Sequence, residues 1–238
     1  FILDGAKTLV SHGGSADRIV VSARLAGERR AREGLALFLI DAGAPGVARR
    51  GYATIDGGRA AEIGLSGVRV TRQALIGEPG RAYALIERVV GHAIAALCAE
   101  ATGAMAVLHA MTVDYLKTRR QFGVPIGTFQ VLQHRAADML VALEQARSMA
   151  MYAAMMADDP DADARRAAIA AAKVQIGRSA RFIGQQAIQL HGGIGMTMEY
   201  KAGHYFKRLT AIDLAFGDAD HHLGLLAALP GIVGEQAA

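Results

Sequence analysis

The chain has 238 residues, of which 52% are apolar, and a formal net charge of +4. This length allows one large domain or two small ones around a substantial core. Basic residues occur in short scattered groups without interleaved aromatic residues, which argues against nucleic-acid binding. The sequence contains no signal-peptide pattern and no uninterrupted apolar run of membrane length. We therefore expect a cytoplasmic protein that contacts neither nucleic acid nor a membrane.

Cysteine and histidine give little sign of disulfide or metal chemistry. Cys98 is the one cysteine, lies in an alanine-rich helical pattern and is predicted to be a small core residue. The pair His221 and His222 resembles a metal motif, but neighbouring residues on a helix point about 100° apart. No further ligand set lies nearby in the sequence. We expect no metal site.

The first 76 residues carry the pattern of an antiparallel sheet or part of a barrel. Short apolar runs at 18–24 and 35–40 are bounded by glycine and charge, and further short runs follow to residue 70. The opening 1–7 is typical of a strand that meets a turn. Because a domain seldom begins in this way, we expect a C-terminal piece of a longer enzyme.

The pattern changes at Gly77, after which apolar residues recur at helical spacing and alanine becomes abundant. Long helices with short connections predict an up-and-down bundle. We therefore place a domain boundary between 76 and 77, with a partial β-domain at 1–76 and a helical domain at 77–238. The predicted helices cover 81–118, 129–157, 163–189, 204–214 and a last segment from 218 to before Pro230.

Two motifs in the helical part suggest a phosphate-bearing ligand. The first is Arg119-Arg120-Gln121-Phe122-Gly123, and the second, about 70 residues later, is Gln189-Leu190-His191-Gly192-Gly193-Ile194-Gly195. Arginine suits phosphate oxygens, and glycine lets the backbone approach a pyrophosphate. Each motif alone is also typical of an ordinary helix end. A dinucleotide fingerprint is excluded because the glycine cluster follows a helix and not a strand.

Taken together, these motifs resemble the acyl-CoA dehydrogenase family. The resemblance is strongest in RRQFGVPIGTFQVLQHRAADM and QLHGGIGMTMEY, and Gly5 to Gly13 is similar to a strand of that family's middle domain. It covers nearly the whole chain, and the segments 95–101, 114–119 and 216–222 look most like small subunits of two-subunit, pimeloyl-CoA-type dehydrogenases. It implies an α+β fragment, in which a partial antiparallel β-domain precedes the up-and-down helical bundle of the family's C-terminal domain.

The resemblance also implies the cofactor FAD and the residues that contact it. Ser11 matches the hydroxyl residue that bonds the flavin ring, whereas Leu9 stands where the family often has an aromatic residue. The residues implied to contact FAD across a subunit interface are Arg119, Gln121, Phe122, Gln130, Gln189, Gly192 and Gly193.

The implied activity is α,β-dehydrogenation of an acyl-CoA thioester, fatty or dicarboxylic, as in fatty-acid β-oxidation. In the family a carboxylate base removes the α-proton, the β-hydride passes to the flavin, and an electron-transfer flavoprotein or similar acceptor reoxidises it. Homologous subunits assemble into tetramers, so we expect one subunit of a homo- or heterotetramer.

The catalytic base of the family is missing from this sequence. Phe216 stands where most members have glutamate, directly before Gly217, and Ala93 stands at the alternative position, 29 residues before Phe122. Asp218 is the nearest candidate, although an acid there is also typical of a helix cap. His92, Glu87 and Glu100 are poorer substitutes by their position or residue type.

Two interpretations of the missing base follow. In one, Asp218 acts as the base in an altered geometry. In the other, this chain is a non-catalytic subunit that completes the flavin site of a homologous partner carrying the glutamate. We favour the second because both expected positions are vacant. An oxidase or nitroalkane chemistry on the same fold is a third alternative, and release of hydrogen peroxide would distinguish it.

Overall fold

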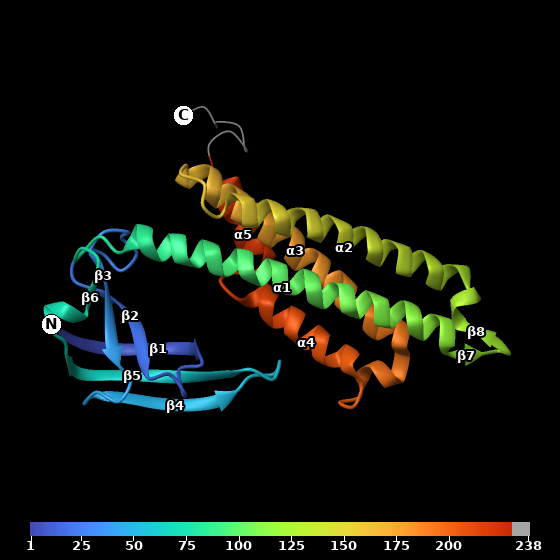
Figure 1. Ribbon diagram of the computed structural model, residues 1–238, viewed down its shortest axis with the longest axis horizontal. Helices are drawn as coiled ribbons and strands as arrows, with labels where there is room; N and C mark the ends of the chain where they lie inside the picture. The colour runs from blue at the N-terminus through green and yellow to red at the C-terminus, as the bar shows by residue number, and fades with distance from the viewer. Residues whose placement is uncertain (230–238) are drawn as a thin grey trace. The chain divides into compact units, whose positions relative to one another are not determined.

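The computed structural model describes residues 1–229, and these form two compact units. The first unit is Phe1–Val89 and contains the sheets, and the second begins at Val90 and contains the helical bundle (Figure 1). Helix α1 (Tyr83–Thr118) starts in the first unit and continues into the second. This order of a small antiparallel β-unit and a bundle confirms the predicted fold class.

The first unit consists of two three-stranded antiparallel sheets. One has the order β1 (Ile2–Ser11), β5 (Arg59–Arg69), β4 (Val47–Ala53). The other has the order β2 (Arg18–Arg24), β3 (Leu35–Asp41), β6 (Leu75–Ile76), and the short helix η1 (Arg72–Ala74) precedes β6.

Both sheets contribute to one apolar core. Val21 of β2 and Phe38 of β3 are buried together with Ile63 and Val68 of β5. On β2 these residues alternate with exposed ones, as in a strand with one face toward the core. The alternation explains why the short apolar runs seen in the sequence form strands of this sheet pair.

Strand β1 continues past the opening segment 1–7, where a turn was predicted, and includes most of the segment from Gly5 to Gly13 that resembles a strand of the family's middle domain. It continues to Ser11 and pairs with β5 along its length, with shifts of register between Leu3 and Gly5 and between Lys7 and Val10. Gly5 has φ 140°, and Leu9, inside the second shift, has φ 52°. Such bulges bend a strand without ending it. The glycine that suggested a turn therefore marks a bulge.

The second unit contains the remaining helices, joined by short connections. They are α2 (Gln130–Met156), α3 (Ala162–His191), α4 (Lys201–Leu214) and α5 (Ala219–Ala227), with the single turns η2 (Ile126–Thr128) and η3 (Gly192–Met196). Asp161 caps α3 by accepting hydrogen bonds from the backbone N–H groups of Asp163 and Ala164. Each helix lies within a few residues of its predicted position.

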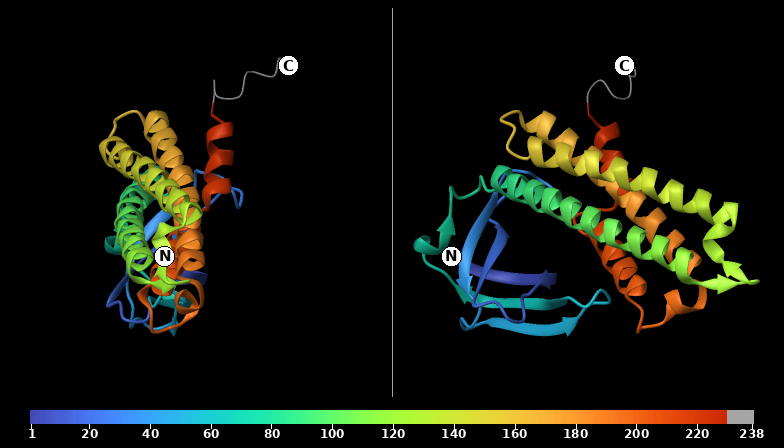
Figure 2. Two further views of the ribbon diagram at one scale, coloured as in Figure 1. Left: turned by 90° about the vertical axis from the view of Figure 1, so that its right-hand side faces the viewer. Right: turned by 45° about the vertical axis from the view of Figure 1, so that its right-hand side comes forward.

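Helix α3 is the central helix of this unit. It packs against α2, α4 and α5 (Figure 2). Of its 30 residues, 15 are buried. Small residues allow neighbouring helices to approach closely. A Cβ added at Gly184 would lie 2.6 Å from the Phe206 ring of α4, so only glycine fits at that crossing.

Helix α1 is long and apolar enough to cross a membrane by length and composition, a test that core helices of soluble proteins also pass. Its buried residues, among them Met105 and Leu108, belong to the bundle core. Cys98 lies on the same face and is fully buried, as predicted for a small core residue. Burial raises the pKa of the Cys98 thiol to about 11.

Candidate functional site

The first motif forms a small hairpin between α1 and α2. Strand β7 (Arg120–Gln121) pairs with β8 (Val124–Pro125), and the N–H of Ile126 donates to the Arg119 carbonyl at 2.8 Å. The two residues of the loop, Phe122 and Gly123, have φ 53° and 82°. Positive φ at both positions is what the tightest hairpin turns require. The motif is therefore a hairpin and not a plain helix end.

Phe122 is the most unusual residue of this hairpin. Its side chain is 92% exposed, although phenylalanine rarely adopts positive φ. It contacts Phe129 edge-on, with ring centroids 6.2 Å apart. A strained conformation that presents an apolar ring to the outside indicates a functional role.

The polar side chains around the hairpin are exposed and have few internal partners. Gln121 Nε2 donates to the carbonyl of Arg120 at 2.8 Å, and Arg120 Nη2 donates to the carbonyl of Gly123 at 2.7 Å. Within residues 1–229, the side chains of Arg119 and Gln130 make no hydrogen bond or ion pair. These donors are free to contact a ligand.

The second motif closes α3 with a glycine turn. Gly192 has φ 62°, and a Cβ added at Gly192 or Gly193 would meet nothing within 4 Å. Gln189, one turn earlier, is exposed. At Gly195, in contrast, an added Cβ would lie 3.0 Å from the Cβ of His191. The first two glycines thus border open space, and the third packs against the helix end.

An aromatic cluster brings the two motifs to the same end of the bundle. The ring of Tyr115, in the last turn of α1, lies 4.7 Å from that of His191, and the His191 ring lies 4.9 Å from that of Tyr200. His191 is 3% exposed, and its Nδ1 contacts the Ala187 carbonyl at 2.8 Å. Burial lowers the pKa of His191 and favours the neutral ring. This cluster was not predicted from the sequence.

Ser11 belongs to the β-unit. It is the last residue of β1, is exposed, and pairs with Ala60 of β5. Leu9, two residues earlier, is 65% exposed at its bulge. Both side chains are accessible at the end of this strand.

The turn that carries Phe216 and Asp218 is stabilised from within. Phe216 and Gly217 have φ 57° and 97°, and the ring of His222 contacts the Phe216 carbonyl through Nε2 at 3.0 Å. Asp218 is the N-cap of α5 and accepts a hydrogen bond from the N–H of His221 at 2.9 Å. This bond lowers the pKa of Asp218. The geometry favours the capping role, and the role as base stays a prediction.

The other candidate bases have partners elsewhere. Glu100 forms a two-bond ion pair with Arg208 of α4, at 2.6 and 2.8 Å. His92 Nε2 lies 3.3 Å from the carboxylate of Asp158. Among residues 1–229 there is also no group of three or more side chains that could ligate a metal ion.

A buried lysine, Lys173, stabilises the end of α4, just before this turn. Lys173 is 1% exposed, and its ammonium donates to the carbonyls of Ile212 at 2.8 Å and Asp213 at 2.6 Å, at the end of α4. Arg181 donates to Asp213 Oδ2 at 2.9 Å. Lys173 is four residues after Ile169 and three before Ile176, so helical spacing could have placed it on the buried face.

A comparison with known protein families identifies the family of this chain. Residues 82–229 match the acyl-CoA dehydrogenase C-terminal domain, and this match covers more than half of the chain. The chain belongs to the acyl-CoA dehydrogenase family. The resemblance inferred from the hairpin and glycine motifs is therefore confirmed.

Individual relatives agree with this assignment. The human mitochondrial short-chain specific acyl-CoA dehydrogenase is 29% identical over 219 residues, which are 89% of this chain and 52% of that protein. The acryloyl-CoA reductase (NADH) of Anaerotignum propionicum is 26% identical, over 95% of this chain and 58% of that protein. The glutaryl-coenzyme A dehydrogenase complex with glutaryl-CoA superposes with a TM-score of 0.87 and 25% identity, over 95% of this chain and 57% of that one. The chain spans about half the length of the curated relatives it matches.

Proposed function

We propose that this chain takes part in FAD-dependent α,β-dehydrogenation of an acyl-CoA thioester. The observation that carries the proposal is the meeting of the hairpin and the glycine turn at one end of the bundle, through Tyr115 and His191. A family member whose two flavin motifs are adjacent in space retains the means to bind the cofactor. The fatty or dicarboxylic nature of the acyl chain is part of the proposal and rests on the resemblance.

The residues present fit FAD. Arg119 and Gln130 offer donors that have no partner within residues 1–229, Phe122 offers an exposed apolar ring, and Gly192 and Gly193 leave open space beside the backbone. Arginine and glycine backbone are the groups that pyrophosphate oxygens prefer. We propose that Gln121 and Gln189 complete this contact and that Ser11 contacts the flavin ring. When bound, FAD supplies the acceptor for the hydride.

Removal of the α-proton requires a base that this chain does not place at either family position. Phe216 and Ala93 cannot accept a proton, and Asp218 is engaged as a helix cap with a lowered pKa. We therefore propose that a homologous partner subunit provides the carboxylate and that this chain completes the flavin site. A similar solved structure, the ChsE4-ChsE5 complex from Mycobacterium tuberculosis, contains two different chains (26% identity, TM-score 0.81).

Exposed apolar side chains on α2 support assembly with other subunits. They include Val131, Val141, Met151 and Met155, the last of which is 78% exposed. A tetramer of homologous subunits, reoxidation by an electron-transferring flavoprotein and a cytoplasmic location remain parts of the proposal.

An anaerobic titration with acyl-CoA substrates, monitored by flavin absorbance, tests which subunit provides the catalytic base. We expect bleaching only when the homologous partner is present. Bleaching of the chain alone would place a base within it and would overturn the non-catalytic assignment. Oxygen consumption with release of hydrogen peroxide would instead indicate an oxidase.

FAD affinity tests the cofactor site separately. Replacing Arg119 by alanine is expected to weaken FAD binding about 10- to 100-fold, because a charge-assisted hydrogen bond to phosphate contributes about 1.5–3 kcal/mol. The matched control is Arg178→Ala, an exposed arginine of α3 away from both motifs. Equal affinity of the two variants would remove Arg119 from the site.

A further inference from the structure

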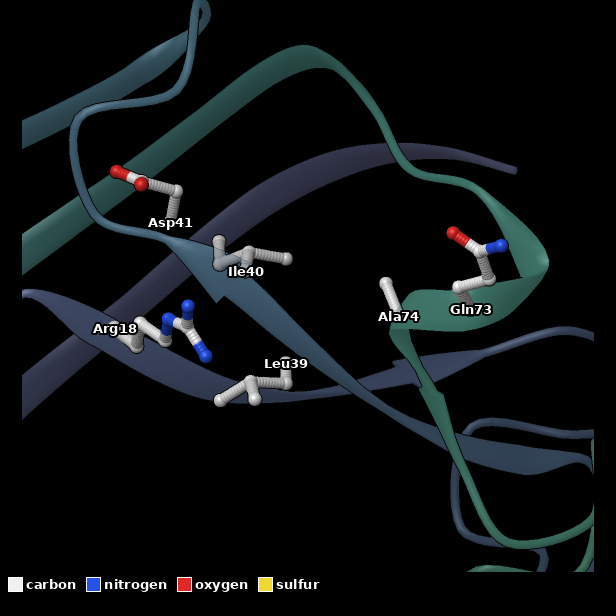
Figure 3. Close-up of a pocket in the computed structure, with 6 residues that line it drawn as sticks. All are labelled: Arg18, Leu39, Ile40, Asp41, Gln73 and Ala74. Atoms are coloured by element: carbon white, nitrogen blue, oxygen red, sulfur yellow. The ribbon is translucent and has the colours of Figure 1, made fainter.

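Two surface pockets of the β-unit differ in charge. The larger, about 480 Å³, is lined by Arg18, Leu39, Ile40, Asp41, Gln73 and Ala74 (Figure 3). Arg18 and Asp41 are directly paired residues of β2 and β3. The charges that line this pocket are therefore balanced, and it offers no charge preference to a ligand.

The smaller pocket, about 280 Å³, lies at the far end of the other sheet and is cationic. It is lined by His12, Gly14, Ser15, Arg49, Gly51, Arg59 and Ala60. Its lining residues, all within the described chain, include two arginines and a histidine but no carboxylate. Asp56, in the turn that precedes Arg59, accepts hydrogen bonds from the Thr54 hydroxyl and the Gly58 N–H.

The cationic groups come from β4, from the start of β5 and from the residue after β1, which are fixed relative to one another. His12 follows β1, and its N–H donates to the carbonyl of Arg59 at the start of β5, at 3.0 Å. Arg49 of β4 donates through Nη1 to the carbonyl of Ala16 at 2.9 Å and to that of Gly13 at 3.4 Å. The turn after β1 is therefore tied to β4 by a guanidinium group. The pocket is preorganised, so a ligand need not order it.

Gly14 and Gly51 both line this pocket, and their backbones lie close together. A Cβ added at Gly14 would lie 3.5 Å from the Cα of Gly51, and one added at Gly51 would lie 3.8 Å from the Cα of Gly14. The backbones thus face each other without side chains between them. The Arg59 guanidinium has no hydrogen bond or ion pair within residues 1–229, so its donors can turn to a ligand.

We propose that this pocket binds a phosphate group, as free phosphate or as the phosphate monoester of a nucleotide ligand. A guanidinium group can bind a phosphate through two parallel N–H···O hydrogen bonds, and His12 adds an imidazole donor. Phosphate binding here is independent of the proposed dehydrogenation. Only the identification of the ester with the 3′-phosphate of coenzyme A rests on the proposed function.

Isothermal titration of the full chain with inorganic phosphate at low salt tests the pocket. Arg59→Gln is expected to weaken binding about tenfold, because it removes charge-assisted hydrogen bonds without touching a structural contact. Arg69→Gln, an exposed arginine at the other end of the same strand, is the matched control and should bind within about twofold of the wild type. Equal phosphate binding by wild type and Arg59→Gln overturns the proposal.

A second variant, Gly51→Val, keeps both arginines and adds a side chain at a residue that lines the pocket. The added Cβ of Gly51→Val meets only ordinary contacts, and valine suits a strand, so the variant should fold. It is expected to lose phosphate binding although both arginines remain. Retention of wild-type affinity would contradict the assignment.

Titration with coenzyme A and dephospho-coenzyme A identifies the source of the phosphate. Tighter binding of coenzyme A, with the difference abolished in Arg59→Gln, assigns the pocket to the 3′-phosphate. Equal binding of the two compounds, with inorganic phosphate still bound, assigns it to free phosphate. Binding of inorganic phosphate needs no flavin and no partner subunit. A chain that does not bind phosphate would therefore contradict the proposed pocket and leave the proposed dehydrogenation untouched.

Discussion

Two turns of the helical unit contain a phenylalanine at positive φ followed by glycine, and they use their side chains in opposite ways. In the hairpin at Phe122 the ring is 92% exposed, and Arg119 beside it has no internal partner within the described residues. In the turn at Phe216 the backbone is bonded by His222, and Asp218 is occupied as a helix cap. The first turn therefore leaves its polar groups available to a ligand, whereas the polar groups of the second turn stabilise the turn itself.

The largest expected effect concerns the support under the second turn. Lys173→Ala leaves the carbonyls of Ile212 and Asp213 without a donor and opens a cavity, and should lower the free energy of unfolding by about 3–5 kcal/mol. Urea unfolding measures it. The exposed Lys201→Ala is the control and should change stability by less than about 0.5 kcal/mol. A loss of similar size in both variants would show that the buried ammonium is not a specific support.

The two turn glycines form a matched pair. Gly217→Ala should cost about 2–3 kcal/mol, because it adds strain at φ 97° and its Cβ would lie 2.3 Å from the His221 ring. Gly123→Ala, at φ 82° with nothing within 4 Å, should cost only about 1 kcal/mol. Thermal unfolding of both variants checks the order. The reverse order would mean that the hairpin, and not the second turn, is the tightly packed one.

The pH dependence of stability tests the histidine contact of the second turn. Burial lowers the pKa of His222, so below the ordinary value of about 6.5 the unfolded chain binds a proton that the folded chain does not. The free energy of unfolding should therefore fall as the pH drops below about 6.5, by at most about 1.4 kcal/mol per pH unit for each such group. Urea midpoints at about pH 7.5 and about pH 5.5 measure the slope.

The slope should be smaller in His222→Gln, while the exposed His134→Gln leaves it unchanged. Part of the slope remains in His222→Gln, since burial also lowers the pKa of His191. An unchanged slope in His222→Gln would exclude this histidine as the sensitive group.

The smallest effect separates capping from catalysis at Asp218. Asp218→Ala should lose about 1 kcal/mol of stability, whereas Asp218→Asn, which can still cap the helix, should lose less than about 0.5 kcal/mol. We expect flavin bleaching in the reconstituted enzyme to proceed in Asp218→Asn at the wild-type rate. A loss of bleaching with normal stability would make Asp218 the base.

The sequence analysis predicted those parts of the structure that depend on periodicity. Helices α2 and α3 begin and end within two residues of their predicted bounds, because their apolar spacing and the Asp161 cap are local signals. Strand β1 was predicted less well, since a glycine inside a strand gives the same signal for a bulge as for a turn. The proposed domain boundary between 76 and 77 stays a prediction.

The candidate site was only partly visible in the sequence. The exposed donors Arg119 and Gln189 stand in contiguous motifs and could be named, and their roles toward FAD stay predictions. The contact of Tyr115 with His191 and the hydrogen bonds of Lys173 to Ile212 and Asp213 depend on residues brought together by tertiary packing. The pocket at Arg49 and Arg59 likewise requires the register of β4 and β5, which no local pattern specifies.

The burial of Cys98 has a practical consequence for spectroscopy. A thiol with a pKa of about 11 and no exposed surface is almost entirely protonated near neutral pH and inaccessible to maleimide or nitroxide reagents. Since the chain has no other cysteine, one introduced at an exposed position such as Val131 would be the single labelled site in an otherwise unmodified background. Two introduced cysteines, one on the sheets and one on the bundle, would carry a pair of probes that measures the distance between the two units in solution.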